Sequence, residues 1–455
     1  MDFTFLDRQQ VQFQNKEEFQ ARLEIAIKYL IGINDAAKIV LDPRASVALD
    51  YFRQASSDFE IISKFMNVIE IFSNVLSYTK KDLISYVNTY ETLNELKDAN
   101  GVEKLYISQF QLSFKTVLIC WNASNRSKEF KYKFYDCKGF EAMLSYISDE
   151  TFVKNCTRFK FPNTKRVNSN EQPGVRFLRA IIGTMNNVSK IADDVKQSMN
   201  KLNAAQIIMK FAINMKEYLS HRMSAYMAAA NILNDNEIET LPDTKLVVHD
   251  IISLISVCSN ALKTKKGIQR DMVTIDGKNE RRETVFIVST NLSNYHIIEL
   301  LQVLYKIAVN DTIKMELFDS FKLSVHLEIL ILEGNLTEKE YSLRCLWQLC
   351  FQASIAQRVH ENKKLYEYIC ELVSSENTNV QKFSNGIIWS IDRTKPQETK
   401  DDQIQNSPTN EKKTKQHIMI SYNSYSRELC MNVKRELENL EYKIWIGIRR
   451  NNESC

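Results

Sequence analysis

An internal repeat of 42 residues constrains the fold of this chain more than any other sequence feature. Tyr305, Trp347 and Trp389 recur at this interval. The apolar residues around them recur as well: Leu304 matches Leu346 and Ile388, and Ile307 matches Leu349 and Ile391. Within each unit the apolar residues follow i, i+3, i+4 spacing, which gives a helix one apolar face. A unit of this length cannot bury that face alone, so we expect neighbouring units to stack around one continuous core.

A helical repeat of this length resembles the armadillo and HEAT families. Residues 341–352 and 382–393 are similar to the core helix of an armadillo unit. The resemblance covers residues 293–393 and is looser over 177–262. Before Trp121 it is faint, and there the helices are predicted from periodicity alone. It implies a mainly α fold, an armadillo/HEAT-like α-solenoid with an extended surface for partner proteins.

The scarcity of turn-forming residues supports this fold class. The chain has 455 residues but only 10 glycines and 6 prolines. A β-sandwich or β-barrel needs a turn signal every ~8–12 residues. Glycine and proline supply many of these turns, so the composition excludes both architectures and favours helices joined by short polar loops.

Charge, cysteine usage and hydropathy limit the cellular setting. The net charge of +4 comes from 60 basic and 56 acidic residues, so we expect no nucleic-acid partner. Nine cysteines are scattered singly, which favours a reduced, cytoplasmic protein. The first residues lack the apolar run of a signal peptide. We find no run of ~18 apolar residues, so we predict no membrane insertion.

Three segments interrupt the helical pattern. Residues 263–284 are charged and contain two glycines, and residues 160–174 contain two prolines, so we predict an exposed loop at each. Residues 393–415 have Ile404 as their only large apolar residue, which predicts a flexible linker. We therefore divide the chain into an N-terminal helical region (1–160), armadillo-like repeats (161–392), a linker (393–415) and a final segment (416–455).

The final segment has a different hydrophobic pattern. Residues 417–422 form a short apolar run typical of a buried strand. Residues 426–440 have amphipathic helical spacing, and residues 442–448 form a second strand candidate. A strand, a helix and a strand with short connections predict a βαβ unit with parallel strands.

This segment resembles the beginning of a TIR domain. The family's first strand ends in a phenylalanine-isoleucine-serine-tyrosine type of motif, and its second strand often reads tryptophan-isoleucine-aspartate. The matching residues are Ile420, Ser421, Tyr422, Trp445 and Ile446. Gly447 departs from the pattern because it stands where the family has an acidic residue. The resemblance implies the start of a flavodoxin-like α/β sheet, truncated after two strands and one helix.

The same resemblance bears on catalysis. The family's catalytic glutamate, present in its NAD-cleaving members, lies on a later helix, and no residue of this chain corresponds to it. Tyr422 and Asn423 correspond to the floor of the nicotinamide pocket, but a strand end followed by a turn is the favoured interpretation. The six histidines never fall at metal-ligand spacing. We therefore expect no enzymatic activity, no catalytic residues, no metal and no cofactor. We also expect the βαβ fragment to be poorly stable alone.

Two sets of repeat positions have alternative interpretations. Tyr305, Trp347 and Trp389 are interpreted as core between repeats, and the alternative is that they line a binding groove. Asn310 and the pair Asn186 and Asn187 are interpreted as helix caps. The alternative for these asparagines is that they grip an extended peptide backbone in a groove.

An armadillo-like array followed by a TIR segment resembles a signalling architecture, and the resemblance implies an intracellular signalling scaffold. We expect the solenoid to bind partner proteins and the TIR segment to link it to signal transduction, with other TIR-containing chains among the partners. Such a chain could also inhibit assemblies of complete relatives. The alternative is a TIR-type NAD hydrolase, which applies if the chain is an incomplete version of a longer protein.

Overall fold

The computed structural model describes most of the chain. The described residues are 15–56, 58–93, 100–158, 172–191, 193–233, 244–266, 268, 270–274, 281–289, 292–309, 311–394, 417–422, 427–439 and 443–448. The contact pattern divides the chain into two units, which we describe separately. Unit 1 is Met1–Lys395 and unit 2 is Pro396–Cys455.

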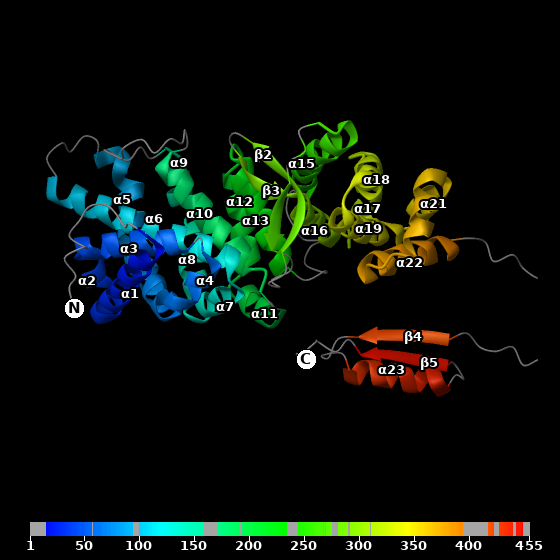
Figure 1. The fold of residues 1–455 in the computed structure, drawn as a ribbon, viewed down its shortest axis with the longest axis horizontal. Helices are drawn as coiled ribbons and strands as arrows, with labels where there is room; N and C mark the ends of the chain where they lie inside the picture. The colour runs from blue at the N-terminus through cyan, green and yellow to red at the C-terminus, as the bar shows by residue number, and fades with distance from the viewer. Residues whose placement is uncertain are drawn as a thin grey trace, which may run out of the picture. The chain divides into compact units, whose positions relative to one another are not determined.

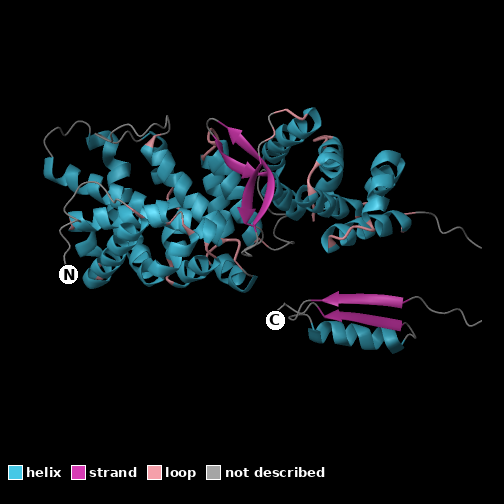
Figure 2. Ribbon diagram, viewed as in Figure 1, coloured by secondary structure: helices cyan, strands magenta, loops and turns pink. Residues whose placement is uncertain are grey.

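Unit 1 is built almost entirely from helices, which follow one another along the array (Figures 1 and 2). Its first half contains α1 (Lys16–Ile33), α2 (Ala36–Leu41), α3 (Pro43–Ala55), α4 (Phe59–Ile62), a 3-10 helix (Ser63–Val68), α5 (Ile69–Leu93), α6 (Asn100–Arg126), α7 (Lys128–Asp136), α8 (Gly139–Ile147) and α9 (Glu150–Arg158). Its second half contains α10 (Pro173–Val188), α11 (Asp193–Lys201), α12 (Ala204–Asn214), α13 (Leu219–Ile232), α15 (Thr244–Thr264), α16 (Ile297–Ile307), α17 (Asp311–Asp319), α18 (Leu323–Glu333), α19 (Leu336–Cys350), α20 (Ala353–Glu361), α21 (Lys363–Leu372) and α22 (Thr378–Asp392).

The 42-residue period reappears as a period of whole helices. Helix α17 begins at Asp311 and α20 at Ala353, while α19 begins at Leu336 and α22 at Thr378; both intervals are 42 residues. Each unit of this period contains three helices, which is the armadillo type of repeat. The predicted armadillo-like array is therefore confirmed by the arrangement of the helices themselves.

A chain of helix contacts runs through unit 1. Helix α3 packs on α6, α6 on α10, α10 on α13, α13 on α16, α16 on α19, and α19 on α22. We call these seven helices the helix ladder. Because α6 packs on α10, the predicted boundary at residue 160 does not separate two packing units. The predicted loop at 160–174 lies mostly outside the described residues, and its last two residues already begin α10.

Asparagine caps and left-handed lysines shape the ends of these helices. Asn335, Asn362 and Asn377 accept backbone N–H groups at the starts of α19, α21 and α22. The turns before α8 and α18 pass through Lys138 (φ 60°) and Lys322 (φ 53°), in the left-handed region that glycine adopts most easily. Glycine scarcity therefore did not exclude tight turns, because other residues adopt them here at some cost in strain.

One prediction for unit 1 is wrong: residues 263–284 are not an exposed loop between helices. Strands β1 (Arg270–Thr274) and β2 (Arg281–Ser289) pair antiparallel, and β3 (Leu292–His296) adds a third strand on the other side of β2. Strand β2 packs against α15, α16 and α19. The charges of this segment obscured a β-branched and aromatic run, residues 284–288, which favours a strand.

Two contacts fix this sheet to the repeat beside it. The guanidinium of Arg270 binds both carboxylate oxygens of Glu338, at 2.7 and 3.2 Å. Glu338 is fully buried and closes a capping box with Asn335, whose side-chain amide also donates to the Glu283 carbonyl at 2.8 Å. The start of α19 is therefore held by the sheet as well as by its own cap.

One helix in the described part of the chain is long and apolar enough to cross a membrane. This is Lys245–Thr264, and 56% of its most apolar window is buried inside unit 1. It packs against α16 and α18 as part of the core. A core helix of this kind satisfies the same length and composition test, so the finding is weak evidence for a membrane span.

Unit 2 is a strand, a helix and a strand in the predicted order. Strand β4 (His417–Tyr422) pairs in parallel with β5 (Lys443–Ile448), and α23 (Arg427–Asn439) contacts both strands. The register places Ile420 beside Ile446 and Met419 beside Trp445. Residues 395–416, most of the predicted linker, lie outside the described residues.

Candidate functional site

Tyr305, Trp347 and Trp389 lie at the same position of the last three ladder helices, α16, α19 and α22. Their burial decreases toward the end of the ladder. Tyr305 and Trp347 are half-buried, whereas 52% of Trp389 is exposed. The interpretation as repeat core is therefore wrong for Trp389, because no later ladder helix in the described part of unit 1 covers it. The other two residues lie at the edge of the core.

Trp347 fits closely against a glycine of the next helix. A Cβ atom at Gly386 would lie 2.4 Å from Cε2 of Trp347. The same arrangement occurs earlier in the ladder, where a Cβ at Gly183 would lie 2.4 Å from Nε1 of Trp121. A glycine on one ladder helix thus makes space for an indole on the helix before it.

Trp347 also lies near two aromatic rings. The centroid of its ring system lies 5.7 Å from that of Phe351 and 5.9 Å from that of Phe383. Phe351 is 49% exposed, and the indole Nε1 of Trp347 is buried without a hydrogen-bond partner among the described residues. A buried N–H without an acceptor costs about 1–3 kcal/mol. This N–H lies against the next helix, because a Cβ at Gly386 would be 2.6 Å from Nε1.

Two guanidinium groups stack on these aromatic rings. Cζ of Arg344 lies 4.1 Å from the centroid of Tyr305, and Cζ of Arg393 lies 4.7 Å from that of Trp389. Neither arginine forms an ion pair with a carboxylate in the described part of the chain. We call Tyr305, Trp347, Phe351 and Trp389 the aromatic row.

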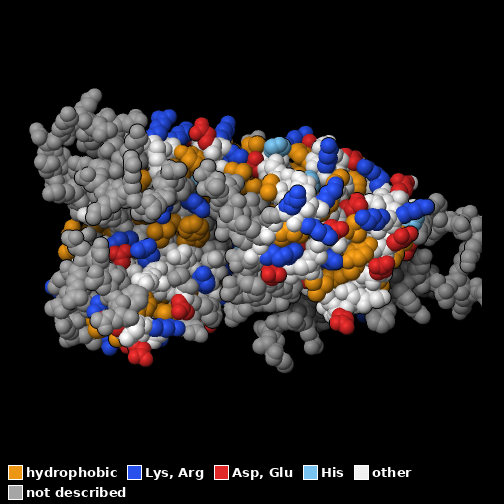
Figure 3. Space-filling view, turned by 45° about the horizontal axis from the view of Figure 1, so that its top comes forward, with side chains coloured by type: hydrophobic (Ala, Val, Ile, Leu, Met, Phe, Trp, Pro, Cys, Tyr) orange, Lys and Arg blue, Asp and Glu red, His pale blue; other side chains and the backbone are white. Residues whose placement is uncertain are grey.

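The aromatic row is cationic and apolar at once. The ammonium of Lys314 also lies 5.8 Å from the centroid of Phe351, although Asp311 pairs with this lysine at 2.5 Å. Stacking on aromatic rings positions cations without neutralising them. The row therefore suits a ligand that combines carboxylates with apolar side chains. In Figure 3 hydrophobic side chains lie among charged ones over the C-terminal helices of unit 1.

Of the candidate asparagines Asn186, Asn187 and Asn310, Asn187 forms hydrogen bonds to a neighbouring helix. Asn187 is buried, and its amide donates to the Trp121 carbonyl at 3.4 Å and to Ser124 Oγ at 3.2 Å on the neighbouring ladder helix. It is neither a helix cap nor a groove residue, so both interpretations are wrong for it. Asn186 is buried too, and its Oδ1 has no hydrogen-bond partner among the described residues. Asn310 lies outside those residues.

Asn187 is one member of a series of polar contacts between successive ladder helices. In each, an amide or ammonium group of one helix donates to a backbone carbonyl or a serine hydroxyl at or near the C-terminal end of the helix before it. The other members are Asn122 to Ser56 Oγ (3.3 Å), Asn231 to Ser189 Oγ (3.1 Å), Lys306 to the Ala230 carbonyl (2.9 Å) and Gln348 to the Ala308 carbonyl (3.5 Å). Sequence spacing alone could not show these pairs, because the intervals between donor and acceptor vary from 40 to 76 residues.

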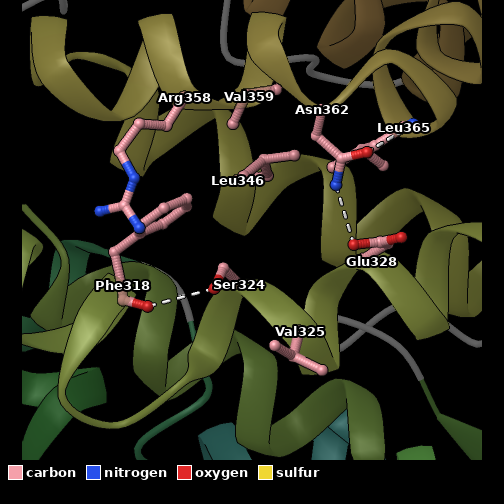
Figure 4. A pocket seen from close by; sticks show the side chains of 9 residues that line it. All are labelled: Phe318, Ser324, Val325, Glu328, Leu346, Arg358, Val359, Asn362 and Leu365. Atoms are coloured by element: carbon pink, nitrogen blue, oxygen red, sulfur yellow. Dashed lines mark hydrogen bonds between the residues drawn. The ribbon is translucent and has the colours of Figure 1, made fainter.

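A pocket of about 240 Å³ opens beside the last repeats, between α17, α18, α19, α20 and α21 (Figure 4). Its apolar lining includes Leu346 and Val359, and polar pairs lie at its sides. The guanidinium of Arg358 stacks on Phe318 at 4.8 Å, and Asn362 donates to Glu328 at 2.9 Å. The polar groups are thus already paired within the protein, so the pocket offers room for an apolar side chain and little to orient a reacting molecule.

Two basic groups with strongly lowered pKa values in the described part of the chain lie on separate helices. Burial lowers the pKa of His221 to about 4, and its Nε2 bonds to the Val175 carbonyl at 2.9 Å. Burial and the nearby Lys190 lower the pKa of Lys131 to about 7. The two lie on different helices, α13 and α7. No group of three or more acidic, histidine or cysteine side chains in the described ranges could hold a metal ion.

In unit 2 the structure brings the motif positions of the two strands together. Ile420 pairs with Ile446, Ser421 with Gly447, and Tyr422 with Ile448. These are backbone neighbours at the carboxyl ends of parallel strands, where ligands bind in open α/β sheets. Asn423 lies outside the described residues.

Comparisons with known proteins give a limited result. No protein-family model matches the chain, and no curated protein matches it. Among solved structures, an engineered protein aligns at 15% identity with a TM-score of 0.37 and covers 86% of this chain and 98% of its own. A structure described as a conserved phosphorylation switch controlling the interaction between cadherin and beta-catenin aligns at 12% identity with a TM-score of 0.46, over 82% of this chain and 70% of the other.

A designed armadillo repeat protein in complex with the peptide (KR)4 aligns at 10% identity with a TM-score of 0.27, over 81% of this chain and 99% of its own. These TM-scores lie below 0.5, so they do not by themselves assign the fold. The three-helix period and the helix ladder carry that assignment. The chain is an armadillo-like helical-repeat protein.

Proposed function

We propose that this protein is a scaffold that binds other proteins through the aromatic row. The observation that carries the proposal is the stacking of Arg344 and Arg393 on exposed or half-buried rings, without carboxylate partners in the described part of the chain. Aromatic residues and arginine are enriched where protein interfaces concentrate their binding energy. A partner segment with acidic and apolar side chains matches both features of the row.

Unit 2 supports a role in signalling. Its parallel β4–β5 pair and α23 have the order of elements that the TIR resemblance implies. We propose that it links partner binding on the array to other TIR-containing chains, in the cytoplasm, and that the protein is not an enzyme. The cysteines that the structure describes are unpaired, which agrees with a reducing compartment.

Fluorescence anisotropy with defined peptides would test the proposal. Three labelled peptides of equal length would combine leucine with glutamate, lysine or serine. We expect the glutamate peptide to bind most tightly and Arg344→Ala to weaken it by about ten-fold, the effect of one charged contact. Arg126→Ala, an exposed arginine of α6, is the matched control and should change nothing. Equal binding of all three peptides, or an equal effect of both variants, would refute the proposal.

A further inference from the structure

Lys131 on α7 is a nearly buried amine without a partner. It is 5% exposed, and its side chain has no hydrogen bond or ion pair among the residues that the structure describes. An ammonium in such a place loses its hydration without gaining an acceptor, so the neutral amine is favoured. The pKa of Lys131 accordingly falls from 10.5 to about 7.

The charges around Lys131 favour an anion over a cation at the end of its side chain. After burial, Lys190, just beyond the end of α10, and Lys128, on α7 itself, lower the pKa of Lys131. Glu299 on α16 opposes them with a smaller effect, and its carboxylate already binds the Lys190 ammonium at 2.8 Å. Two cations that disfavour an ammonium favour a negative charge at the same place.

A neutral lysine amine is a nucleophile at neutral pH. Its lone pair can attack the carbon of CO2: the N–C bond forms, one C–O π pair moves to oxygen, and the nitrogen releases one proton to water. The product is a carbamate with one negative charge, and the step needs no oxidant or reductant. An imine formed with an aldehyde would be neutral or cationic and would gain nothing from Lys190. An acyl donor would need a wider opening than a side chain that is 5% exposed provides.

We propose that Lys131 is a carbamylation site, at which CO2 adds to the side-chain amine and Lys190 stabilises the resulting carbamate. The site goes beyond the proposed function, because it shares no residue with the aromatic row. The carbamate belongs to the folded protein, since the unfolded chain exposes Lys131 to water and leaves it protonated at neutral pH. CO2 therefore stabilises the folded chain.

Trapping with triethyloxonium would test the site in the full chain. This reagent converts a carbamate to a stable ethyl carbamate, which peptide mass spectrometry identifies when isotope-labelled bicarbonate is the source of CO2. At about pH 7.5 most of Lys131 is neutral, whereas about one in a thousand exposed lysines is. We expect Lys131 to be labelled at least about ten-fold more than Lys133, an exposed lysine on the same helix. Equal labelling of the two lysines, or none at Lys131, would overturn the proposal.

Two variants of one ion pair separate the effect of charge from that of looser packing. At limiting CO2, Lys190→Gln removes a cation that favours the carbamate and should lower the labelling of Lys131 about ten-fold. Glu299→Gln removes the opposing anion and should raise it. Both changes break the contact between residues 190 and 299. A shift of the labelling in the same direction for both would overturn the assigned role of Lys190, and circular dichroism would verify that each variant is folded.

Thermal unfolding gives an independent readout. Bicarbonate should raise the Tm of the unchanged chain relative to chloride at equal ionic strength and pH, because CO2 binds only the folded state. Lys131→Met has no amine at this position and should show no such increase. An equal increase for both proteins would overturn the stabilisation at Lys131.

Discussion

Gly386 and Trp347 lie so close together that no side chain fits between them: a Cβ at residue 386 would be 2.4 Å from Cε2 of the indole. This contact joins α22 to α19, and the same contact between Gly183 and Trp121 joins α10 to α6. Glycine in a helix costs about 1 kcal/mol relative to alanine. Its presence here is explained by the close approach of the indole.

Gly386→Ala should therefore destabilise the protein by about 1–2 kcal/mol, because the overlap with Trp347 outweighs the gain in helix propensity. Urea unfolding would measure the change in free energy. Gly32→Ala in α1 is the matched control, since nothing lies within 4 Å of a Cβ there. It should stabilise the protein by about 1 kcal/mol. Stabilisation by both changes would show that the Trp347 contact is looser than described.

Lys322→Gly should stabilise the protein by about 0.5–1 kcal/mol. Lys322 adopts φ 53°, and relief of this strain exceeds the added entropy of glycine in the unfolded chain. Thermal unfolding followed by circular dichroism would detect the increase in Tm. Lys363→Gly, just after the Asn362 cap of α21, replaces a lysine in a right-handed helix and should lower Tm. A lower Tm for both variants would show that the left-handed conformation of Lys322 costs less than the added entropy of glycine.

Lys131→Met should stabilise the protein at pH 6 by about 3 kcal/mol and change little at pH 10.5. Burial lowers the pKa of Lys131 from 10.5 to about 7, so between these values the unfolded chain binds more protons than the folded one. The free energy of unfolding therefore rises with pH between about 7 and 10.5, as the penalty for burying the charged Lys131 is lost. Urea unfolding at a series of pH values would show a shallower slope for the variant. An unchanged slope would refute the assignment.

Glu338→Ala should cost about 3 kcal/mol, because it leaves Arg270 unpaired and removes half of the capping box of α19. Hydrogen exchange should show faster opening of β1 and of the first turn of α19. Glu361→Ala, an exposed carboxylate at the end of α20, should have little effect. Unchanged exchange at β1 would mean that other contacts hold the sheet.

The purified chain should leave NAD intact. Unit 2 has two described strands and one described helix, which do not build the remaining walls of a nicotinamide pocket of the TIR type. Chromatography after incubation with NAD would measure turnover, with a heat-denatured sample as the blank. Release of nicotinamide above that blank would contradict this expectation and favour the hydrolase alternative.

Much of the architecture was predictable from apolar spacing. The 42-residue interval of Tyr305, Trp347 and Trp389 identified the repeat, and the run at residues 417–422 identified β4. Such patterns are local: they report which face of an element is apolar and how long the element is. The three-stranded sheet was missed because charged residues dominated the composition of residues 263–284.

Residue spacing was enough to predict the helical class, the repeat interval and the strand-helix-strand order of the final segment, because each depends on spacing within one element or between equivalent ones. The role of each repeat position could be seen only in the packing of the folded chain. Trp389 is exposed, whereas Trp347 at the equivalent position is half-buried. Asn187 was expected to cap its own helix, but its amide donates a hydrogen bond to the neighbouring helix. Burial and hydrogen bonding depend on which helix comes next in space, and residues far apart in the sequence supply that neighbour.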